Sequence, residues 1–409
     1  MEKGACLGVS IVALQIQPRV SSSSSWMDPG PWGTSAHYIG SLESAHYIGT
    51  LVAPTHATLL CTSVPYLWIH AWMGSAIVVY TVLLAHPASF AIVWTCASHS
   101  LIDWYNPDTS VFASGAFPNG GLPQLDINSA AGDPASLGTA ALLIGKTIPA
   151  YTSAATRQAR HLLDVVPRWE NGAISHREDV AELWSDSTFM VPPFLAYYGV
   201  ATGNLTVMKD ALSQGVLYRD VLGIPARENN SAAGLWKHIV GPQSADFGLW
   251  STGNGWAAMG MMHVLAIAKH SGWEASLKPE ISTLKSVVKD VLDAVIHVDK
   301  AEPDEPLLRN YLNDTTWFGE LSGTSMLAAT AYRAAELDSK TFGHEYVHWA
   351  DEKRMAVEAR INPETGLLAP VINPLGWGDR TPAVESPEGQ SFGIMLFAAE
   401  RSLKGRGTD

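Results

Sequence analysis

The sequence has few cysteines and few charged side chains. Its 409 residues include three cysteines, Cys6, Cys61 and Cys96, all within the first hundred residues. Neither a disulfide framework nor a cysteine-based zinc site can therefore hold the body of the protein together, and the core depends on packing. Only 16% of the residues are charged, the net charge is -13, and no lysines or arginines form a run. Binding phosphates requires a basic surface, so nucleic acid is excluded as a partner.

Strand signals are also scarce, because alternating runs of valine, isoleucine and threonine between hairpin turns are missing. Apolar residues recur instead at helical spacing, most clearly between Pro279 and Val298. We predict helices over residues 134–148, 153–166, 192–201, 204–221, 255–270, 279–297, 324–338, 342–360 and 387–402. The fold class is therefore all-α. Paired helices whose loops carry WKH, STGNGW and ESPEGQ favour a toroid or bundle with the loops meeting at one mouth.

The N-terminal part of the chain differs from the rest. An apolar stretch over residues 5–14 is short for a signal peptide and is followed by no clean cleavage site. The hexapeptide SAHYIG then occurs twice, at residues 35–40 and 44–49. Two copies are too few for a solenoid, so we interpret them as a local duplication.

A long uncharged stretch follows the duplication. No charged residue lies between Glu43 and Asp103, and residues 73–85 are apolar enough for a membrane-spanning core. No flanking lysine or arginine orients this run, so a buried helical pair and a segment of non-native coding sequence, such as a retained intron, are alternatives. We predict an atypical region over residues 1–104 and a helical domain over residues 105–405.

Two features bear on location and ligand class. Three N-x-Ser/Thr sequons begin at Asn204, Asn229 and Asn313, as expected of a secreted protein. Anchoring through the apolar run of residues 73–85 is the alternative location. The fifteen tryptophans are many for this length and fit a soluble protein whose clefts stack on sugar rings.

The stretch AISHREDVAELWSDSTFMV, which begins at Ala173, concentrates unusual chemistry around Asp186. This carboxylate lies between Trp184 and the apolar residues that begin at Phe189. Burial beside bulky apolar groups raises the pKa of a carboxyl, so we expect Asp186 to hold a proton near neutral pH, as a general acid must. The alternative role is a cap of the following helix. His176 and Arg177 lie about ten residues earlier.

Two further motifs carry polar residues with an open role. In GLWKH, Trp236 precedes His238, whose imidazole can meet a sugar hydroxyl or a carboxylate or simply bond to the backbone. In ESPEGQ, Glu385 and Glu388 could form a carboxylate pair. Pro387 followed by an acid and an apolar run is also typical of a helix start, and we favour that interpretation.

The motif LWSTGNGW places two tryptophans around a Gly-Asn-Gly sequence. Gly253 and Gly255 would permit tight or positive-φ backbone that lets a ligand approach. Trp250 and Trp256 would offer stacking faces. No cluster of histidines or carboxylates with metal-ligand spacing lies near Asp186, so we expect no metal.

These four motifs together resemble the unsaturated rhamnogalacturonyl and glucuronyl hydrolases of glycoside hydrolase families 88 and 105, especially the fungal members. The resemblance covers about residues 105–403 in motif order and spacing. It implies an (α/α)6 toroid of six helical hairpins that binds an oligosaccharide with a terminal 4,5-unsaturated uronic acid. An aspartic acid protonates C4, water adds at C5, and the hemiketal opens with loss of the aglycone. This chemistry needs no cofactor, and the two-carboxylate geometry of other glycosidases does not apply.

The resemblance assigns roles to residues of this chain. Asp186 occupies the position of the proton donor in W-x-D, and His176 matches a substrate-contacting histidine. The expected substrate-binding residues are His176, Arg177, Trp184, Met190, Trp236, His238, Trp250, Thr252, Asn254 and Trp256.

Two departures from the family pattern stand out. Bacterial relatives commonly carry arginine where Thr252 stands, and a hydroxyl cannot supply a charge-assisted fork to the uronate carboxylate. Either Arg177 or another basic residue replaces it, or the substrate differs. An upstream functional aspartate is also expected, and Asp103, Asp108 and Asp126 lack a convincing motif. A non-catalytic carbohydrate-binding protein on the same fold is therefore the alternative function.

Overall fold

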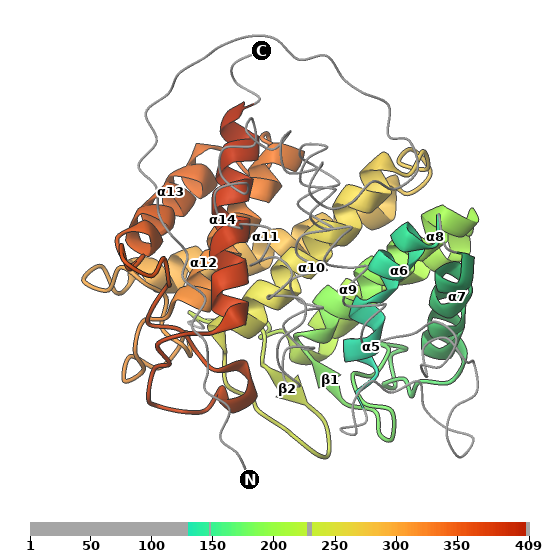
Figure 1. Cartoon of the computed structure of the whole chain (residues 1–409), viewed down its shortest axis with the longest axis horizontal. Coiled ribbons are helices and arrows are strands. Elements are labelled where there is room, and N and C mark those ends of the chain that lie inside the picture. Colours follow the sequence, from blue (N-terminus) through green and yellow to red (C-terminus); the bar gives the residue numbers. More distant parts are fainter. Residues whose placement is uncertain (1–129, 147–148, 227–230, 406–409) are drawn as a thin grey trace.

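The computed structural model describes residues 130–146, 149–226 and 231–405, and these fold into two layers of helices (Figure 1). Long helices of the inner layer pack side by side in chain order. They are α8 (Ser187–Thr202), α10 (Ser251–His270), α12 (Leu321–Leu337) and α14 (Pro387–Gly405). The short helices α5 (Gly132–Ser136) and α6 (Gly138–Ile144) pack on α8 at one end of this row.

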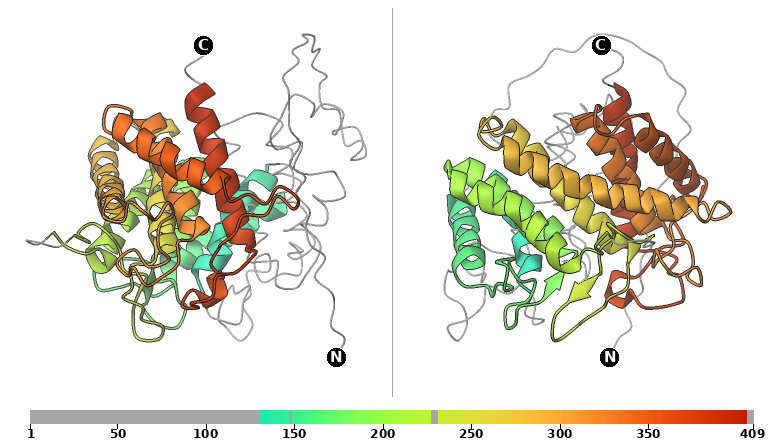
Figure 2. Two further views of the ribbon diagram at one scale, coloured as in Figure 1. Left: turned by 90° about the vertical axis from the view of Figure 1, so that its left-hand side faces the viewer. Right: turned by 180° about the vertical axis from the view of Figure 1, so that it is seen from behind.

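The outer layer is formed by the second helix of each hairpin. Its helices are α7 (Pro149–Asp164), α9 (Leu205–Leu222), α11 (Lys278–Lys300) and α13 (His344–Glu358). Seen from behind, α9 and α11 lie across the inner helices (Figure 2). Helix α11 has the amphipathic pattern expected of such a position, since Leu284, Val288, Val291 and Val295 are all fully buried.

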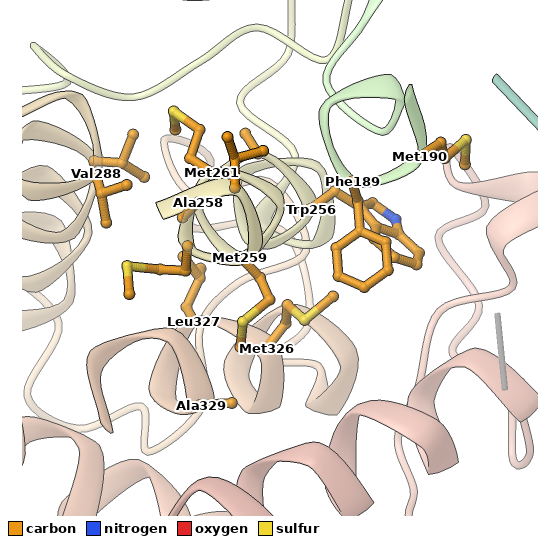
Figure 3. Close-up of a cluster of buried hydrophobic side chains, with 14 of the residues drawn as sticks. Phe189, Met190, Trp256, Ala258, Met259, Met261, Val288, Met326, Leu327 and Ala329 are labelled. Carbon is orange, nitrogen blue, oxygen red and sulfur yellow. The ribbon is translucent and has the colours of Figure 1, made fainter. Parts of the chain in front are cut away.

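The inner helices approach one another closely because small residues lie where they touch. A Cβ on Gly260 of α10 would come within 2.2 Å of the Thr188 carbonyl oxygen of α8. Methionine side chains of α10 and α12 fill the wider spaces, and Phe189 packs on Trp256 with ring centroids 4.6 Å apart (Figure 3). Native interiors are packed to crystal density, so this arrangement fixes the spacing of the layer.

The predicted helices are found, and the mainly helical class is confirmed. One difference is at residues 134–148, where the structure divides the predicted helix into α5 and α6 at Leu137. Another is the predicted helix over residues 192–201, which begins earlier, at Ser187. Pro192 and Pro193 lie inside α8, and each removes one backbone donor from the helix.

Our assignment of STGNGW to a loop was wrong, whereas ESPEGQ begins as a loop and becomes helical at the predicted start, Pro387. Ser251 begins α10, so the whole of STGNGW is helical, and Pro387 begins α14. The glycines Gly253 and Gly255 are absent from the positive-φ positions of the structure. A Cβ on Gly253 would come within 2.5 Å of Ser185 Oγ, so helix packing requires this glycine.

Short backbone pairings hold the N-terminal ends of the inner helices together. Strand β1 (Leu183–Trp184) leads into α8 and pairs antiparallel with β2 (Ile239–Val240). Trp250, before α10, forms a bridge with Tyr311, and the Leu321 amide at the start of α12 donates to the Pro370 carbonyl oxygen. Figure 1 shows β1 and β2 beside the starts of α8 and α10. This end of the helical layer carries the candidate site.

Several predictions concern residues outside the described part of the chain. They include the signal-like start, the SAHYIG duplication, the apolar run of residues 73–85, the upstream aspartates and the domain boundary after residue 104. Among the described residues, no helix is long and apolar enough to span a bilayer.

Candidate active site

Asp186 stands at the N-cap position of α8, but its side chain makes no capping hydrogen bond. The carboxylate accepts a hydrogen bond of 3.1 Å from Ser185 Oγ. Its Oδ2 atom lies 3.3 Å from Nε2 of His238, and the Asp186 side chain is 15% exposed. The helix-cap alternative therefore has no support in the geometry, since the carboxylate faces a histidine instead of the backbone amides of α8.

The expected rise in the pKa of Asp186 was wrong. Burial, the largest single influence, does raise it, but the interactions with His238 and His176 together outweigh burial, so the pKa of Asp186 is lowered. For His238, burial lowers the pKa while Asp186 and Asp246 raise it, and the net direction is upward. Both directions favour the charged forms of the pair, a carboxylate on Asp186 and an imidazolium on His238.

Asp246 and Tyr311 extend this pair. Nδ1 of His238 lies 3.1 Å from Asp246 Oδ2, and the same oxygen accepts a hydrogen bond of 2.6 Å from the Tyr311 hydroxyl. Burial raises the pKa of Asp246, but the hydrogen bonds from His238, Tyr311 and the Gly248 amide outweigh burial and lower the pKa to about 2. One buried imidazole thus lies between two ionised carboxylates.

Aromatic rings surround the imidazole of His238. The ring centroid of Trp250 is 4.5 Å from that of His238, that of Trp377 is 5.0 Å away, and that of Trp184 is 5.8 Å away. Asn310 connects two of these rings, because its Oδ1 accepts from Trp250 Nε1 and its Nδ2 donates to the Trp377 carbonyl oxygen. Trp250 is buried, whereas Trp184 and Trp377 are half-buried. Apolar faces therefore stand beside the carboxylate of Asp186.

His176 and Arg177 lie against Trp184. The imidazole of His176 stacks on the indole with ring centroids 4.6 Å apart, and burial lowers the pKa of His176 to about 4, so this ring is neutral. The Arg177 guanidinium lies 5.1 Å from the centre of the Trp184 ring and 3.6 Å from the Glu182 carboxylate. Glu182 also accepts from the Trp184 indole, which holds this ring in place.

The structure uses the polar residues at the start of α10 for internal contacts. Thr252 is fully buried, and its hydroxyl donates to Glu320 across 3.2 Å. Asn254 donates to the carbonyl oxygens of Trp236 and Trp250 and accepts from the Trp236 amide. Trp256 is also buried. Thr252, Asn254 and Trp256 all lie buried in the interior.

Met190 and Trp236 complete the predicted set. A Cβ on Gly132 of α5 would come within 3.0 Å of the Met190 sulfur and 2.7 Å of His176 Nδ1, so Met190 lies beside His176. Trp236 is fully buried and lies with Gly223 and Asp290 beside the outer helices. The structure thus brings His238 to Asp186, with Trp184 and Trp250 beside the imidazole. His176 and Arg177 lie against Trp184, and Met190 lies beside His176.

The helix start at Pro387 that we predicted is confirmed, but it buries a carboxyl group. Glu388, in the first turn of α14, is 0% exposed. Burial raises the pKa of Glu388 well above its usual value, and the charges of Asp186 and Glu320 raise it further. The surroundings of Glu388 therefore favour its neutral form.

Our sequence analysis missed three residues that lie around His238 in the structure: Asp246, Tyr311 and Trp377. Asp246 lies between GLWKH and LWSTGNGW, so an acid between two informative motifs was a usable signal. Trp377 stands between glycines in a loop, which is an unusual place for a large apolar ring. Nothing in the local sequence singles out Tyr311.

A family model for Glycosyl Hydrolase Family 88 matches residues 136–365. The chain belongs to this family. Residues 136–365 include Asp186, His238, Asp246 and Tyr311. Trp377 lies outside this range, in the loop before α14. The toroid of helical hairpins predicted from the sequence is the fold of the family's solved relatives.

Individual relatives agree with the family assignment. The unsaturated rhamnogalacturonyl hydrolase YesR of Bacillus subtilis is 24% identical over 229 residues, which are 54% of this chain and 61% of the relative. The match thus spans less than two thirds of that relative's length. A possible GH105 member from Klebsiella pneumoniae has a TM-score of 0.62 at 17% identity, covering 94% of this chain and 100% of its own. A possible GH105 member from Salmonella enterica has a TM-score of 0.61 at 17% identity, covering 83% of each chain.

Proposed function

We propose that this protein is a glycoside hydrolase that removes a terminal 4,5-unsaturated uronic acid from an oligosaccharide, with Asp186 as the proton donor. The observation that carries the proposal is the Asp186–His238 pair, whose side chains are 3.3 Å apart within a group of tryptophans. Membership of family 88 and the name of the Bacillus subtilis relative, an unsaturated rhamnogalacturonyl hydrolase, support the substrate class.

The charge state of the pair defines the first chemical step. His238 carries the shared proton in the resting protein, while the reaction needs that proton on Asp186. A sugar that covers the 15% exposed carboxylate withdraws it from water, and the negative charge of a uronate also disfavours a second anion. Both effects raise the proton affinity of Asp186 when the substrate is bound. The proton then moves from Nε2 of His238 to Oδ2 of Asp186.

The remaining steps follow from vinyl-ether chemistry. The O–H bond of Asp186 breaks as a C–H bond forms at C4, and positive charge develops at C5 and the ring oxygen. Water adds at C5 and gives its proton to the Asp186 carboxylate, so the acid acts next as a base. The hemiketal opens, and the aglycone leaves as an alcohol. The Asp186 carboxyl group thus serves both proton transfers. His238, the other partner of the pair, is a neutral imidazole during these steps.

Ring faces and nearby positive charge favour a uronyl sugar. Trp184 and Trp377 are half-buried and offer apolar faces for stacking. The N-termini of α8 and α10 bring the positive ends of two helices to this side of the molecule. Arg177 is the nearby guanidinium, although Glu182 partly offsets its charge. We propose that Arg177 replaces the arginine that bacterial relatives have where this chain has Thr252.

The test follows the alkene of an unsaturated disaccharide by its ultraviolet absorbance. Wild type should consume the alkene, and Asp186→Asn should reduce kcat by about 10²-fold to 10⁴-fold, because an amide cannot transfer the proton. Asp179→Asn is the matched control, since Asp179 lies in the same stretch of chain and its carboxylate contacts the Gln243 side chain.

Each result decides between two functions. Equal rates for wild type and Asp186→Asn would rule out Asp186 as the proton donor. Binding of the disaccharide by wild type without loss of absorbance would favour a non-catalytic carbohydrate-binding protein, the alternative suggested by Thr252.

We further propose that the protein is secreted and acts on pectin-type or related cell-wall fragments. Asn204 and Asn313, which begin two of the three sequons, are exposed. Oδ1 of Asn204 accepts from the backbone amides of Thr206 and Val207, which leaves its Nδ2 atom pointing away from these bonds. Mass spectrometry of the protein expressed in a secreting eukaryotic host should find glycans at these two asparagines.

A further inference from the structure

A continuous row of polar side chains leads away from Asp186. Asp186 Oδ2 lies 3.3 Å from His238 Nε2, and His238 Nδ1 lies 3.1 Å from Asp246 Oδ2. The Tyr311 hydroxyl then donates to the same Asp246 oxygen across 2.6 Å. The His238 side chain is 0% exposed, whereas Asp186 and Asp246 are 15% and 22% exposed. The imidazole is therefore enclosed between two carboxylates that both reach the surface of the site.

The backbone fixes the members of this row relative to one another. The amide of His238 donates to the Gly248 carbonyl oxygen, and the amide of Ser185 donates to the His238 carbonyl oxygen. Asp246 exchanges two backbone hydrogen bonds with Ile239, of 2.8 Å and 3.0 Å, and its Oδ1 accepts from the Gly248 amide. The segment from His238 to Gly248 thus folds back on itself and places Asp246 against the imidazole. Little rearrangement is available to either side chain.

We propose that Asp246, held by Tyr311, is a positioning residue that keeps His238 protonated on both nitrogens and aimed at Asp186. The inference rests on the proposed function, because it assigns the source of the proton that Asp186 delivers. Asp246 does not touch the reacting atoms and acts through the imidazole. Tyr311 supplies the second donor to Oδ2 and so limits how strongly Asp246 attracts the imidazole proton.

The charged and titratable groups around His238 favour this assignment. Asp186 faces it from the start of α8, and Asp246 faces it from the loop after β2. His176, which lies on the other side of Trp184, is neutral because burial lowers its pKa to about 4. Burial raises the pKa of Glu388 at the start of α14, which favours the neutral form of that carboxyl as well.

The arginines near this row have acidic partners of their own. Arg177 lies against Trp184, and its guanidinium is 3.6 Å from the Glu182 carboxylate. Arg380, whose charge acts on Tyr311, lies 3.2 Å from the Asp314 carboxylate. The two carboxylates beside the His238 imidazole therefore favour its cationic form.

The proton transfers balance without any further reactant. The Nε2–H bond of His238 breaks as the O–H bond of Asp186 forms, and His238 is left neutral with its remaining proton on Nδ1, facing Asp246. After Asp186 has protonated C4, water returns one proton to the Asp186 carboxylate. Transfer of that proton back to Nε2 restores the resting pair. Asp246 keeps Nδ1 protonated throughout, which leaves Nε2 as the atom that gives and receives the proton.

The first measurement does not depend on activity. The titration of His238 is followed by NMR of imidazole-labelled protein, and its signal is identified as the one that is lost in His238→Gln. Asp246→Asn should move the midpoint to lower pH by about one unit or more, because a neutral amide no longer stabilises the imidazolium. Tyr311→Phe should move it the opposite way by a smaller amount, because Asp246 then loses a competing donor. A merely structural role would not produce shifts of opposite sign.

The second measurement is the pH dependence of kcat/KM on the unsaturated disaccharide. Activity should fall as pH rises through the pKa of His238, since the pair then loses its proton. Asp246→Asn should move this alkaline limb to lower pH by the same amount as the NMR midpoint. Asp338→Asn is the control, because Asp338 has a pKa lowered to about 2 like that of Asp246, but through Lys285 far from the site. It should leave both readouts unchanged.

The outcomes are distinguishable. An unchanged His238 titration in folded Asp246→Asn overturns the positioning role, whatever the activity. A shifted titration in a protein that never consumes the alkene supports the role of Asp246 and overturns the proposed function. If Asp246→Asn does not fold, Tyr311→Phe provides the test. A titration midpoint of His238 that is unchanged in Tyr311→Phe would also contradict the proposal.

Discussion

Two aspartates at opposite ends of the inner helices show how differently a carboxylate can be used. Asp186, at the start of α8, and Asp338, at the end of α12, both have an ion-pair partner and a lowered pKa. The partner of Asp338 is Lys285, and both side chains are about a quarter exposed. The partner of Asp186 is His238, which is fully buried and can gain or lose its proton near neutral pH.

The comparison shows what separates a structural pair from a reactive one in this molecule. A lysine fixes the charge of its aspartate and adds modest stability. A histidine leaves one proton to be shared, and the surroundings decide which partner carries it. The end of the helices where α8 begins also holds Trp184, Trp250 and Trp377, which exclude water around that proton. Chemistry is therefore expected at that end alone, and three substitutions test the contrast.

Of these three substitutions, Trp377→Ala should have the largest effect. This half-buried ring lies 5.0 Å from His238, and loss of its stacking face should raise KM for the disaccharide by about tenfold, or roughly 1.4 kcal/mol, with a smaller change in kcat. Steady-state kinetics measures the split. Trp273→Ala removes an equally half-buried ring after the end of α10 and should leave KM unchanged. Equal effects of the two substitutions would contradict the contrast between the two ends.

An intermediate effect is expected from Glu388→Gln on stability. Because the folded pKa of Glu388 is raised, the unfolded chain ionises first as pH rises, and the folded state loses stability above about pH 4.5. Glutamine removes this penalty, so the free energy of unfolding should be unchanged near pH 4 and higher by about 1 kcal/mol at about pH 5.3. Urea unfolding at both pH values measures it. Glu385→Gln, an exposed neighbour, should show no gain, and a loss of stability in Glu388→Gln at about pH 5.3 would mean that Glu388 is ionised in the fold.

The smallest effect should come from Asp338→Asn. The depressed pKa of Asp338 means that its stabilising effect is present above about pH 4 and is lost as pH falls through about 2. Because the pair with Lys285 is partly exposed, the substitution should lower the free energy of unfolding by only about 0.5 kcal/mol at pH 7. Thermal unfolding at pH 7 and pH 2.5 checks this. Loss of activity in Asp338→Asn would show that the two ends are coupled.

Much of the fold could be predicted from the sequence, because helical periodicity and helix-start signals are local. The amphipathic pattern of α11 and the Pro-Glu start of α14 are found as predicted. The start of α10 was missed for a physical reason. Ser251, Thr252 and Gly253 resemble a turn, and they are helical because α8 and α12 pack closely on them. Tertiary packing overrides local propensity there.

The candidate site could be predicted only where its residues lie within motifs. Asp186, Trp184 and His176 share one stretch of chain, whereas Asp246, Tyr311 and Trp377 come from three other loops. Only the folding of the chain brings Tyr311 to Asp246 and Trp377 to His238. A local pattern also cannot tell that Asn254 is fully used by the backbone around Trp236 and Trp250.

The sequence by itself determined that this protein is mainly helical and that it resembles the unsaturated uronyl hydrolases. It also singled out Asp186 as the candidate general acid. The tertiary structure decided the charge of that carboxylate. Apolar neighbours in the sequence predicted a raised pKa, but a histidine distant in the sequence lies 3.3 Å away and lowers it. Electrostatic interactions depend on distance in space and on burial, and neither is written in the order of the residues.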